Sequence, residues 1–316
     1  MSEPVTRLGL QIPYFNFEGT PPERLLDRLT EIATTAERSG FDSIWVMDHL
    51  IQIPSVGAQE LWMLEGNMAL MAIAARTSAL KLGLMVGGVT YRNPALHAKM
   101  TTTLDVLSGG RAIHGIGAAW FDAEHEQYGF RYPPIAERFE RLEDHLNIAR
   151  AMFTQERPSY EGRHHSISGV LNNPRPIRGD VPIMVGGGGE RKTLRLVARY
   201  ADASNVFGDA AQVRHKVSVL EGHCEAVGRD PAEITKTRLG TLIVADTHEA
   251  AQRKLANLRP GLDAVRLGAW VGGPDEIAEQ ARAHLDAGLD GLIFNLSDVE
   301  DLESVELAGR VLREAV

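Results

Sequence analysis

Two adjacent titratable residues, Asp48 and His49, follow the apolar segment SIWVM at 43–47. A short β-branched apolar run is typical of a strand, and a titratable pair at its end is placed to act on a bound ligand. Histidine is the side chain best able to exchange a proton near neutral pH. The pair can be catalytic, with His49 exchanging a proton, or structural, with Asp48 capping the following segment and His49 filling a polar gap. Position alone favours neither interpretation.

Four consecutive glycines close a second apolar run, PIMV at 182–185, and a helical pattern begins at about Glu190. Backbone N–H groups of such a turn, with the positive end of the following helix, form an anion site. A flexible turn is the alternative, but four glycines carry a high entropic cost. We therefore expect a phosphate to bind there. The residues expected to hold it are Gly186, Gly187, Gly188, Gly189 and Arg191.

Small residues also follow two other apolar runs. Gly87 and Gly88 follow KLGLMV at 81–86, and Ala118 and Ala119 follow RAIHGIG at 111–117. Small residues allow the backbone to approach a planar ligand closely, but at 87–88 the residues alone favour an ordinary tight turn into the next helix. The segment GIGAAW is not a dinucleotide fingerprint, because position 120 is Trp where the third glycine would stand.

Other catalytic chemistries find little support in the sequence. The eleven histidines include no HxH and no HExxH spacing, and His114 lies within an apolar alternation typical of a core strand. We expect no metal. No GxSxG motif occurs, so a serine nucleophile elbow is absent. The single cysteine, Cys224, lies within a helical pattern and is expected to be inert packing.

The elements that would position these residues alternate along the whole chain. Eight runs are predicted as strands: 8–12, 43–47, 81–86, 111–117, 182–187, 203–207, 238–245 and 291–297. Helical patterns fill the intervals, most clearly at 21–40, at 137–153 and in the first part of 273–294. This alternation predicts an α/β fold, a single (β/α)₈ TIM barrel domain over residues 1–316. A doubly wound open sheet is the rival, and it would require the strand order to reverse.

Three segments exceed simple strand–helix units and are predicted as insertions, near 50–66, 118–136 and 154–180. The first two follow strands, so they belong to the C-terminal face of a barrel, where barrel enzymes carry their chemistry. Both are rich in aromatic residues and methionine, as a substrate pocket would be. The third, rich in Gly, Asn and Pro, suggests a hairpin or lid.

Composition limits the function classes. The chain has 316 residues, of which 44% are hydrophobic, and a formal net charge of −9. An acidic chain without a basic block is a poor candidate for nucleic acid or an anionic membrane. There is no apolar stretch of spanning length and no secretory signal. Together with the single cysteine, these features lead us to expect a cytoplasmic protein.

Three segments carry a family resemblance: SGFDSIWVMDH, LGLMVGGVTYRNPALHAKMTTTLDVLSGGRAIHGIGAAW and PIMVGGGGERKTLRLVARYADASN. They resemble the luciferase-like monooxygenase superfamily, most closely its coenzyme F420 (deazaflavin) dependent oxidoreductase branch. The resemblance runs from about Leu8 to Leu296 and implies a bacterial luciferase-like (β/α)₈ barrel with the cofactor at its C-terminal mouth. It also implies a non-prolyl cis peptide, which falls here on Met85–Val86.

The same resemblance implies site residues. The Asp-His of the family falls on Asp48 and His49, whereas the glutamate that acts with this histidine in the deazaflavin sugar-phosphate dehydrogenases falls on Trp120. A carboxylate partner for His49 is therefore expected to be missing, which argues against sugar-phosphate oxidation. The expected cofactor contacts outside the phosphate turn are Asp48, Met85, Val86, Gly87, Gly88, Ala118 and Ala119. The expected substrate pocket comprises Tyr14, Trp45, Trp62, Trp120 and Phe121.

The function expected from these features is hydride transfer between F420 and a small organic substrate. One alternative is an FMN-dependent monooxygenase that receives reduced flavin from a separate reductase, and another is a non-catalytic flavin- or deazaflavin-binding protein. The expected partners are a small-molecule substrate and, by analogy with the family, a second copy in a homodimer.

Overall fold

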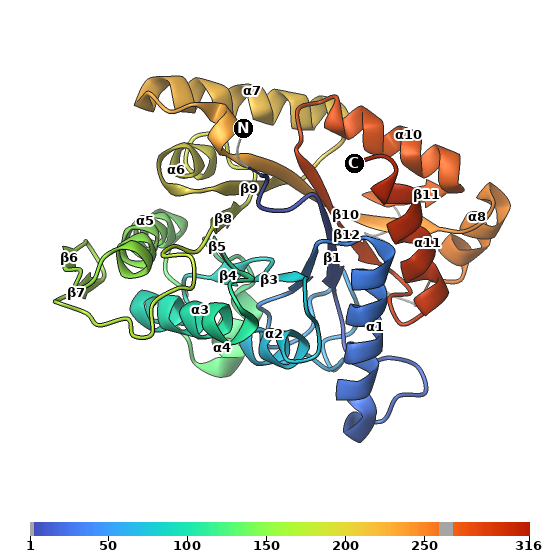
Figure 1. The fold of residues 1–316 in the computed structure, drawn as a ribbon, viewed down its shortest axis with the longest axis horizontal. Coiled ribbons are helices and arrows are strands. Elements are labelled where there is room, and N and C mark those ends of the chain that lie inside the picture. The colour runs from blue at the N-terminus through green and yellow to red at the C-terminus, as the bar shows by residue number, and fades with distance from the viewer. Residues whose placement is uncertain (1–2, 259–267) are drawn as a thin grey trace.

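The eight strands predicted from the sequence pair in parallel around a closed ring (Figure 1). The computed structural model describes residues 3–258 and 268–316. The barrel strands are β1 (Leu8–Ile12), β2 (Ser43–Val46), β3 (Lys81–Leu84), β5 (Ala112–Gly117), β8 (Ile183–Gly186), β9 (Ala203–Val206), β10 (Thr235–Val244) and β12 (Gly291–Leu296). Pairing of β9 with β10 and of β12 with β1 closes the ring. The (β/α)₈ barrel is thus confirmed, and the strand order never reverses.

Helices surround the barrel and follow the strands in sequence. They are η1 (Pro22–Arg24), α1 (Leu25–Ser39), α2 (Gly66–Ala74), α3 (Pro94–Ser108), α4 (Asp122–Tyr128), α5 (Ile135–Thr154), α6 (Thr193–Tyr200), α7 (Ala210–Val227), η2 (Pro231–Glu233), α8 (His248–Ala256), α10 (Pro274–Leu285) and α11 (Leu302–Arg313). α1 shows why the pattern was readable: Leu25, Leu29 and Ile32 form one buried stripe, and Gly40 ends the helix with a left-handed φ of 102°.

Apolar side chains fill the barrel, and Trp45 is the largest of them. Its side chain is fully buried among Met85, Ile113 and Met184, and its indole N–H donates to Ser43 Oγ at 2.8 Å. A Cβ on Gly83 would lie 2.5 Å from the Trp45 ring. β3 therefore has glycine at position 83, where the indole ring needs room. The Trp45 ring also packs against Met85, which lines the mouth of the barrel.

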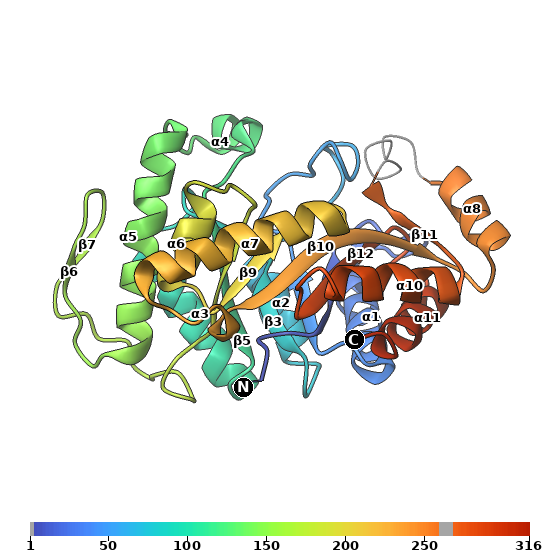
Figure 2. The same ribbon diagram turned by 90° about the horizontal axis from the view of Figure 1, so that it is seen from above.

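The three predicted insertions take different forms. Residues 50–65 run irregularly into α2, and 118–136 contain α4; both lie at the edge of the barrel that is uppermost in Figure 2. In 154–180, β6 (Tyr160–Glu161) pairs antiparallel with β7 (Ser166–Ile167), so the predicted hairpin is present and lies beyond α5. Two short strands were not predicted: β4 (Gly87–Gly88), which pairs with β5, and β11 (Trp270–Gly272), which pairs with β10.

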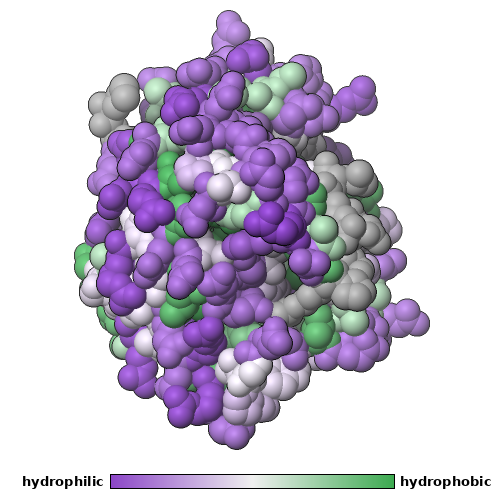
Figure 3. All heavy atoms as spheres, turned by 90° about the vertical axis from the view of Figure 1, so that its right-hand side faces the viewer, coloured by the Kyte–Doolittle hydropathy of each residue, from purple (hydrophilic) through white to green (hydrophobic). Residues whose placement is uncertain are grey.

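Figure 3 shows the face that carries α10 and α11, on which hydrophilic residues predominate and hydrophobic ones are scattered. The part of this face that the structure describes presents no broad apolar surface to a second copy, so the predicted homodimer would need another face. No helix among the described residues is both long and apolar enough to cross a bilayer.

Candidate active site

A cavity of about 310 Å³ opens at the carboxyl ends of the strands. Its wall combines residues from the ends of β2, β4, β5, β8 and β9. They are Asp48, His49, Met85, Val86, Gly87, Gly88, Tyr91, Gly117, Ala118, Ala119, Trp120, Gly186, Gly187, Gly188, Gly189, Thr193, Asn205, Phe207 and Leu239. Most residues that the sequence marked for the cofactor are thus brought together by the barrel, although they lie up to 141 positions apart.

Val86 projects into the region between β5 and β8. The peptide bond Met85–Val86 is cis, as the resemblance implied. A Cβ on Gly117 would lie 2.8 Å from Val86 Cγ2, and one on Gly186 would lie 2.7 Å from the same atom. Glycine at these two strand ends therefore leaves room for Val86. The need for glycine at position 186 is explained by this packing rather than by an approaching phosphate.

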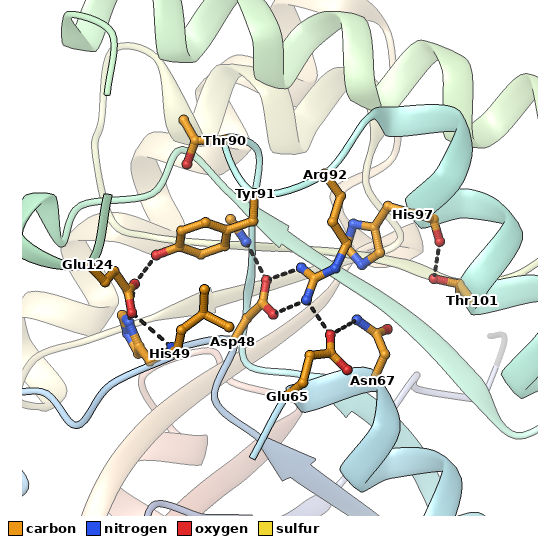
Figure 4. A network of polar contacts seen from close by, with 12 residues as sticks. Asp48, His49, Glu65, Asn67, Thr90, Tyr91, Arg92, His97, Thr101 and Glu124 are labelled. Carbon is orange, nitrogen blue, oxygen red and sulfur yellow. Dashed lines mark hydrogen bonds and ion pairs between the residues drawn. The ribbon is translucent and has the colours of Figure 1, made fainter. Parts of the chain in front are cut away.

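His49 has a buried carboxylate partner, which corrects the prediction that it lacks one. Its Nδ1 lies 2.8 Å from Oε1 of Glu124, a residue of α4 that follows Trp120 by four positions (Figure 4). Glu124 also accepts the Leu50 N–H at 2.9 Å and the Tyr91 hydroxyl. α4 begins shortly after β5, and its first turn brings the Glu124 carboxylate to His49. A search for a carboxylate at position 120 does not find this residue.

The protonation state of this group follows from its contacts. Burial alone would raise the pKa of Glu124, but the hydrogen bonds from His49, Tyr91 and Leu50 outweigh it, and the pKa lies below its ordinary value. Burial and the bond to Glu124 raise the pKa of Tyr91, so its hydroxyl stays protonated and donates. Glu124 is therefore an anion at neutral pH that holds the Nδ1 side of His49 and leaves Nε2 for a ligand.

The carboxylate of Asp48 is bound by Arg92. The Asp48 carboxylate accepts Arg92 Nη1 at 2.7 Å and Nη2 at 2.8 Å, a bidentate pair, and it accepts the Gly88 N–H at 2.9 Å. Arg92 also contacts Glu65, the N-cap residue of α2 (Figure 4). Asp48 thus joins β2 to the glycine segment that follows the cis peptide. This contact gives Asp48 a positioning role in the cavity wall, while burial raises the pKa of its carboxyl against the opposing effect of Arg92.

The glycine turn forms the part of the cavity wall that follows β8. Gly187 has a φ of 121°, which side-chain-bearing residues rarely adopt. α6 begins at Thr193 rather than near Glu190, because the turn extends three residues further. Lys216 of α7 donates from Nζ to Gly188 O at 2.8 Å and so places a cation at the turn. Arg191, which was predicted for this role, is exposed and does not line the cavity.

Of the five predicted substrate-pocket residues, only Trp120 lines the cavity, where its ring lies 5.5 Å from that of His49. Trp45 lies inside the barrel. Tyr14 donates to Ser297 O at 3.0 Å, Trp62 packs on the core, and Phe121 joins Met47 and Ile53 in a separate cluster. Aromatic character alone does not show which rings point into the cavity.

Glu124, Tyr91, Arg92 and Lys216 were the functional candidates that the sequence analysis missed. Tyr91 and Arg92 follow Gly88 by three and four positions, and this closeness to the glycines is a signal that could have found them. Glu124 required knowledge that a helix begins at Asp122, and Lys216 required the packing of α7 on the glycine turn.

Comparison with known proteins places these residues in a family context. Residues 6–290 match the family model described as luciferase-like monooxygenase. An F420-dependent glucose-6-phosphate dehydrogenase from Segniliparus rotundus is 29% identical, in an alignment that covers 90% of this chain and 92% of the relative. A protein of the same name from Amycolatopsis mediterranei is 27% identical and covers 84% and 87% of the two chains.

Solved structures share the fold at lower identity. An F420-dependent secondary alcohol dehydrogenase in complex with an F420-acetone adduct superposes with a TM-score of 0.80 at 18% identity, over 98% of this chain and 99% of the other. The EDTA monooxygenase from Chelativorans sp. BNC1 gives a TM-score of 0.83 at 18% identity, over 97% and 92% of the two chains.

Proposed function

This chain belongs to the luciferase-like monooxygenase family, and from that premise we propose that it is an oxidoreductase that uses coenzyme F420 to transfer a hydride to or from a small organic substrate. The observation that carries the proposal is that His49, in the wall of a glycine-lined cavity, is paired with the buried carboxylate of Glu124. A substrate that gains or loses a hydride in such a reaction also gains or loses a proton. His49, paired with Glu124, can hold that proton beside a ligand.

The residues of the cavity fit a flat ring that carries a phosphate. Val86, Gly87 and Gly88 offer a wall with little side-chain bulk, and Gly187–Gly189 offer backbone N–H groups, with Lys216 hydrogen-bonded to Gly188 O of the same turn. The amide Nδ2 of Asn205 lines the same cavity, is buried and has no hydrogen-bond partner among the described residues. A ligand acceptor would satisfy this donor.

When bound, F420 supplies the carbon centre that accepts or donates the hydride. Glu124 fixes the ring of His49 and favours the tautomer with the proton on Nδ1, so that Nε2 can accept a proton from a substrate hydroxyl. In the opposite direction, the imidazolium donates that proton and Glu124 stabilises its charge. Trp120, which is 58% exposed at the cavity edge, covers His49 from the solvent side.

The relatives described above are named as F420-dependent dehydrogenases, which supports F420 as the cofactor. The alternative cofactor is FMN, because the family description names a monooxygenase. The presence of Glu124 removes one objection to dehydrogenase chemistry. Titration of the apoprotein with each cofactor tests the proposal, since only the deazaflavin assignment predicts a clear preference for F420.

A second cavity, of about 600 Å³, adjoins the first and shares Phe207 and Leu239 with it. Arg238 in its wall is only 6% exposed, and no carboxylate of the described residues forms an ion pair with it. Its guanidinium lies over the Trp270 ring at 4.9 Å, and Nη1 is buried without a partner. Burial lowers the pKa of Arg238 to about 10, although the negative charge of Asp209 acts to raise it. A buried cation in this state is stabilised by an anion, so the proposed substrate carries a carboxylate or phosphate.

This anchor gives a testable expectation. Inorganic phosphate should bind saturably to the cofactor-loaded protein and change the tryptophan fluorescence through Trp270. Arg238→Met should weaken phosphate binding at least about tenfold, which corresponds to loss of one charge-assisted contact of about 1.4 kcal/mol. Arg199→Met is the matched control, because Arg199 also lies over an aromatic ring, at 5.0 Å from that of Tyr200. Equal phosphate affinity in the two variants would exclude an anion site at Arg238.

A further inference from the structure

Three histidines meet outside the cavity, between the barrel wall and two of its helices. His114 belongs to β5, His97 to α3 and His145 to α5, and each is only 1% exposed. None of them has a part in the chemistry proposed above. Imidazole rings are seldom gathered in a core without a reason, because each nitrogen removed from water needs a partner.

The three rings are arranged around a common point. Each offers a nitrogen, and these nitrogens all lie within 4.8 Å of one another. The ring centroids are 4.5 Å apart for His97 and His114, 5.3 Å for His97 and His145, and 5.2 Å for His114 and His145. With zinc–nitrogen bonds of about 2.0–2.1 Å and tetrahedral angles, imidazole centroids would be separated by roughly 5 Å. The observed spacing agrees with this value.

Hydrogen bonds prepare one ligand and leave the others incomplete. The Thr101 hydroxyl donates to His97 O at 3.1 Å and therefore accepts from His114 Nδ1, which lies 2.8 Å away. His114 Nε2 then carries a lone pair and accepts a hydrogen bond from His145 Nε2 at 2.9 Å, a bond that a bound metal would replace. The Nδ1 atoms of His97 and His145 are buried without a partner among the described residues. Thr101 thus acts on His114 as outer-shell groups act on metal-ligating histidines.

We propose that His97, His114 and His145 form a binding site for one divalent transition-metal ion, for which Zn²⁺ is the fitting probe. Three imidazoles are a ligand set that zinc and its neighbours in the first row accept.

The site lies directly behind the cofactor cavity. A Cβ on Gly87, which lines that cavity, would be 2.7 Å from His97 Cε1. A metal here would tie α3, β5 and α5 together and brace the wall at Gly87. This role is independent of the reaction, and it differs from the absence of metal that the sequence led us to expect.

Calorimetric titration of the EDTA-treated, dialysed full-length protein with Zn²⁺ tests the proposal. We expect one site with a Kd below about 1 µM. Thr101→Val should weaken it roughly 10–100-fold by releasing His114, whereas Thr103→Val, which removes an exposed hydroxyl of the same helix, should leave it unchanged. His145→Asn should weaken binding by more than 100-fold, and His284→Asn, at another buried histidine, should not. Equal affinity in all four variants would overturn the site.

A measurement on the unaltered protein avoids any folding defect of the variants. Crystals soaked in Zn²⁺ or Co²⁺ should show an anomalous-scattering peak between the three imidazoles. Peaks confined to exposed pairs such as His248–Glu276, or no peak at all, would overturn the proposal.

Discussion

Replacement of His49 by alanine is expected to lower kcat by roughly 10²–10⁴, the usual contribution of general acid–base catalysis. The reason is the pairing of His49 with Glu124, which orients the ring at 2.8 Å and prepares Nε2 for proton exchange. Affinity for the cofactor should change little, because the glycine turn lies elsewhere in the cavity. Steady-state rates at saturating cofactor, measured with and without the substitution, test this expectation.

The pH dependence separates a catalytic histidine from one that only positions the cofactor. If His49 exchanges the proton, the pH–rate profiles of wild type and of the His49→Ala variant should differ in shape. The hydrogen bonds from His49, Tyr91 and Leu50 lower the pKa of Glu124, so Glu124→Gln should reduce kcat by removing the anion that orients His49. His165→Ala, at a histidine outside the cavity, serves as the control. A raised cofactor Kd with a saturated rate within a few-fold of wild type would contradict the catalytic role.

Substitution of Gly188 by valine is expected to weaken cofactor binding by about 100-fold, or about 2.7 kcal/mol, equivalent to one or two charge-assisted hydrogen bonds. A Cβ at this position would lie 3.0 Å from Lys216 Cε, so the larger side chain displaces the lysine and blocks the turn. The glycine turn is exposed enough that the melting temperature should fall by only a few degrees.

Two comparisons sharpen the test of the glycine turn. Gly222→Val places the same side chain in open space on α7 and should leave cofactor affinity unchanged. Lys216→Met should reproduce part of the loss, about tenfold, because it removes only the cation. If Gly188→Val unfolds the protein while the folded fraction binds cofactor normally, the turn has a structural role alone.

The architecture could be predicted from sequence because strand and helix patterns are local. Most of the eight strands are short apolar runs that the sequence marks directly. The positions of the cavity glycines followed from the same patterns. β10 began three residues before its predicted start, at Thr235, since polar residues can extend a strand once neighbouring strands pair with it.

The partners within the site could not be predicted, because they depend on the directions of side chains. Glu124 reaches His49 only through the geometry of α4, and Lys216 reaches the glycine turn only through the packing of α7. Trp45 was expected in the substrate pocket because it lies near the end of a strand, three residues before Asp48. Its ring lies inside the barrel instead. The sequence identified the region of the site, whereas packing determined which residues face one another.

The most direct test of the deazaflavin assignment is equilibrium titration of the purified apoprotein with F420 and, separately, with FMN. We expect a Kd for F420 at least about tenfold lower than that for FMN, which corresponds to a binding free energy about 1.4 kcal/mol more favourable for F420. The Gly188→Val variant should weaken the binding of whichever cofactor occupies the cavity, which shows that the measured binding occurs at this site. Equal or tighter binding of FMN would contradict the assignment and leave only membership of the family.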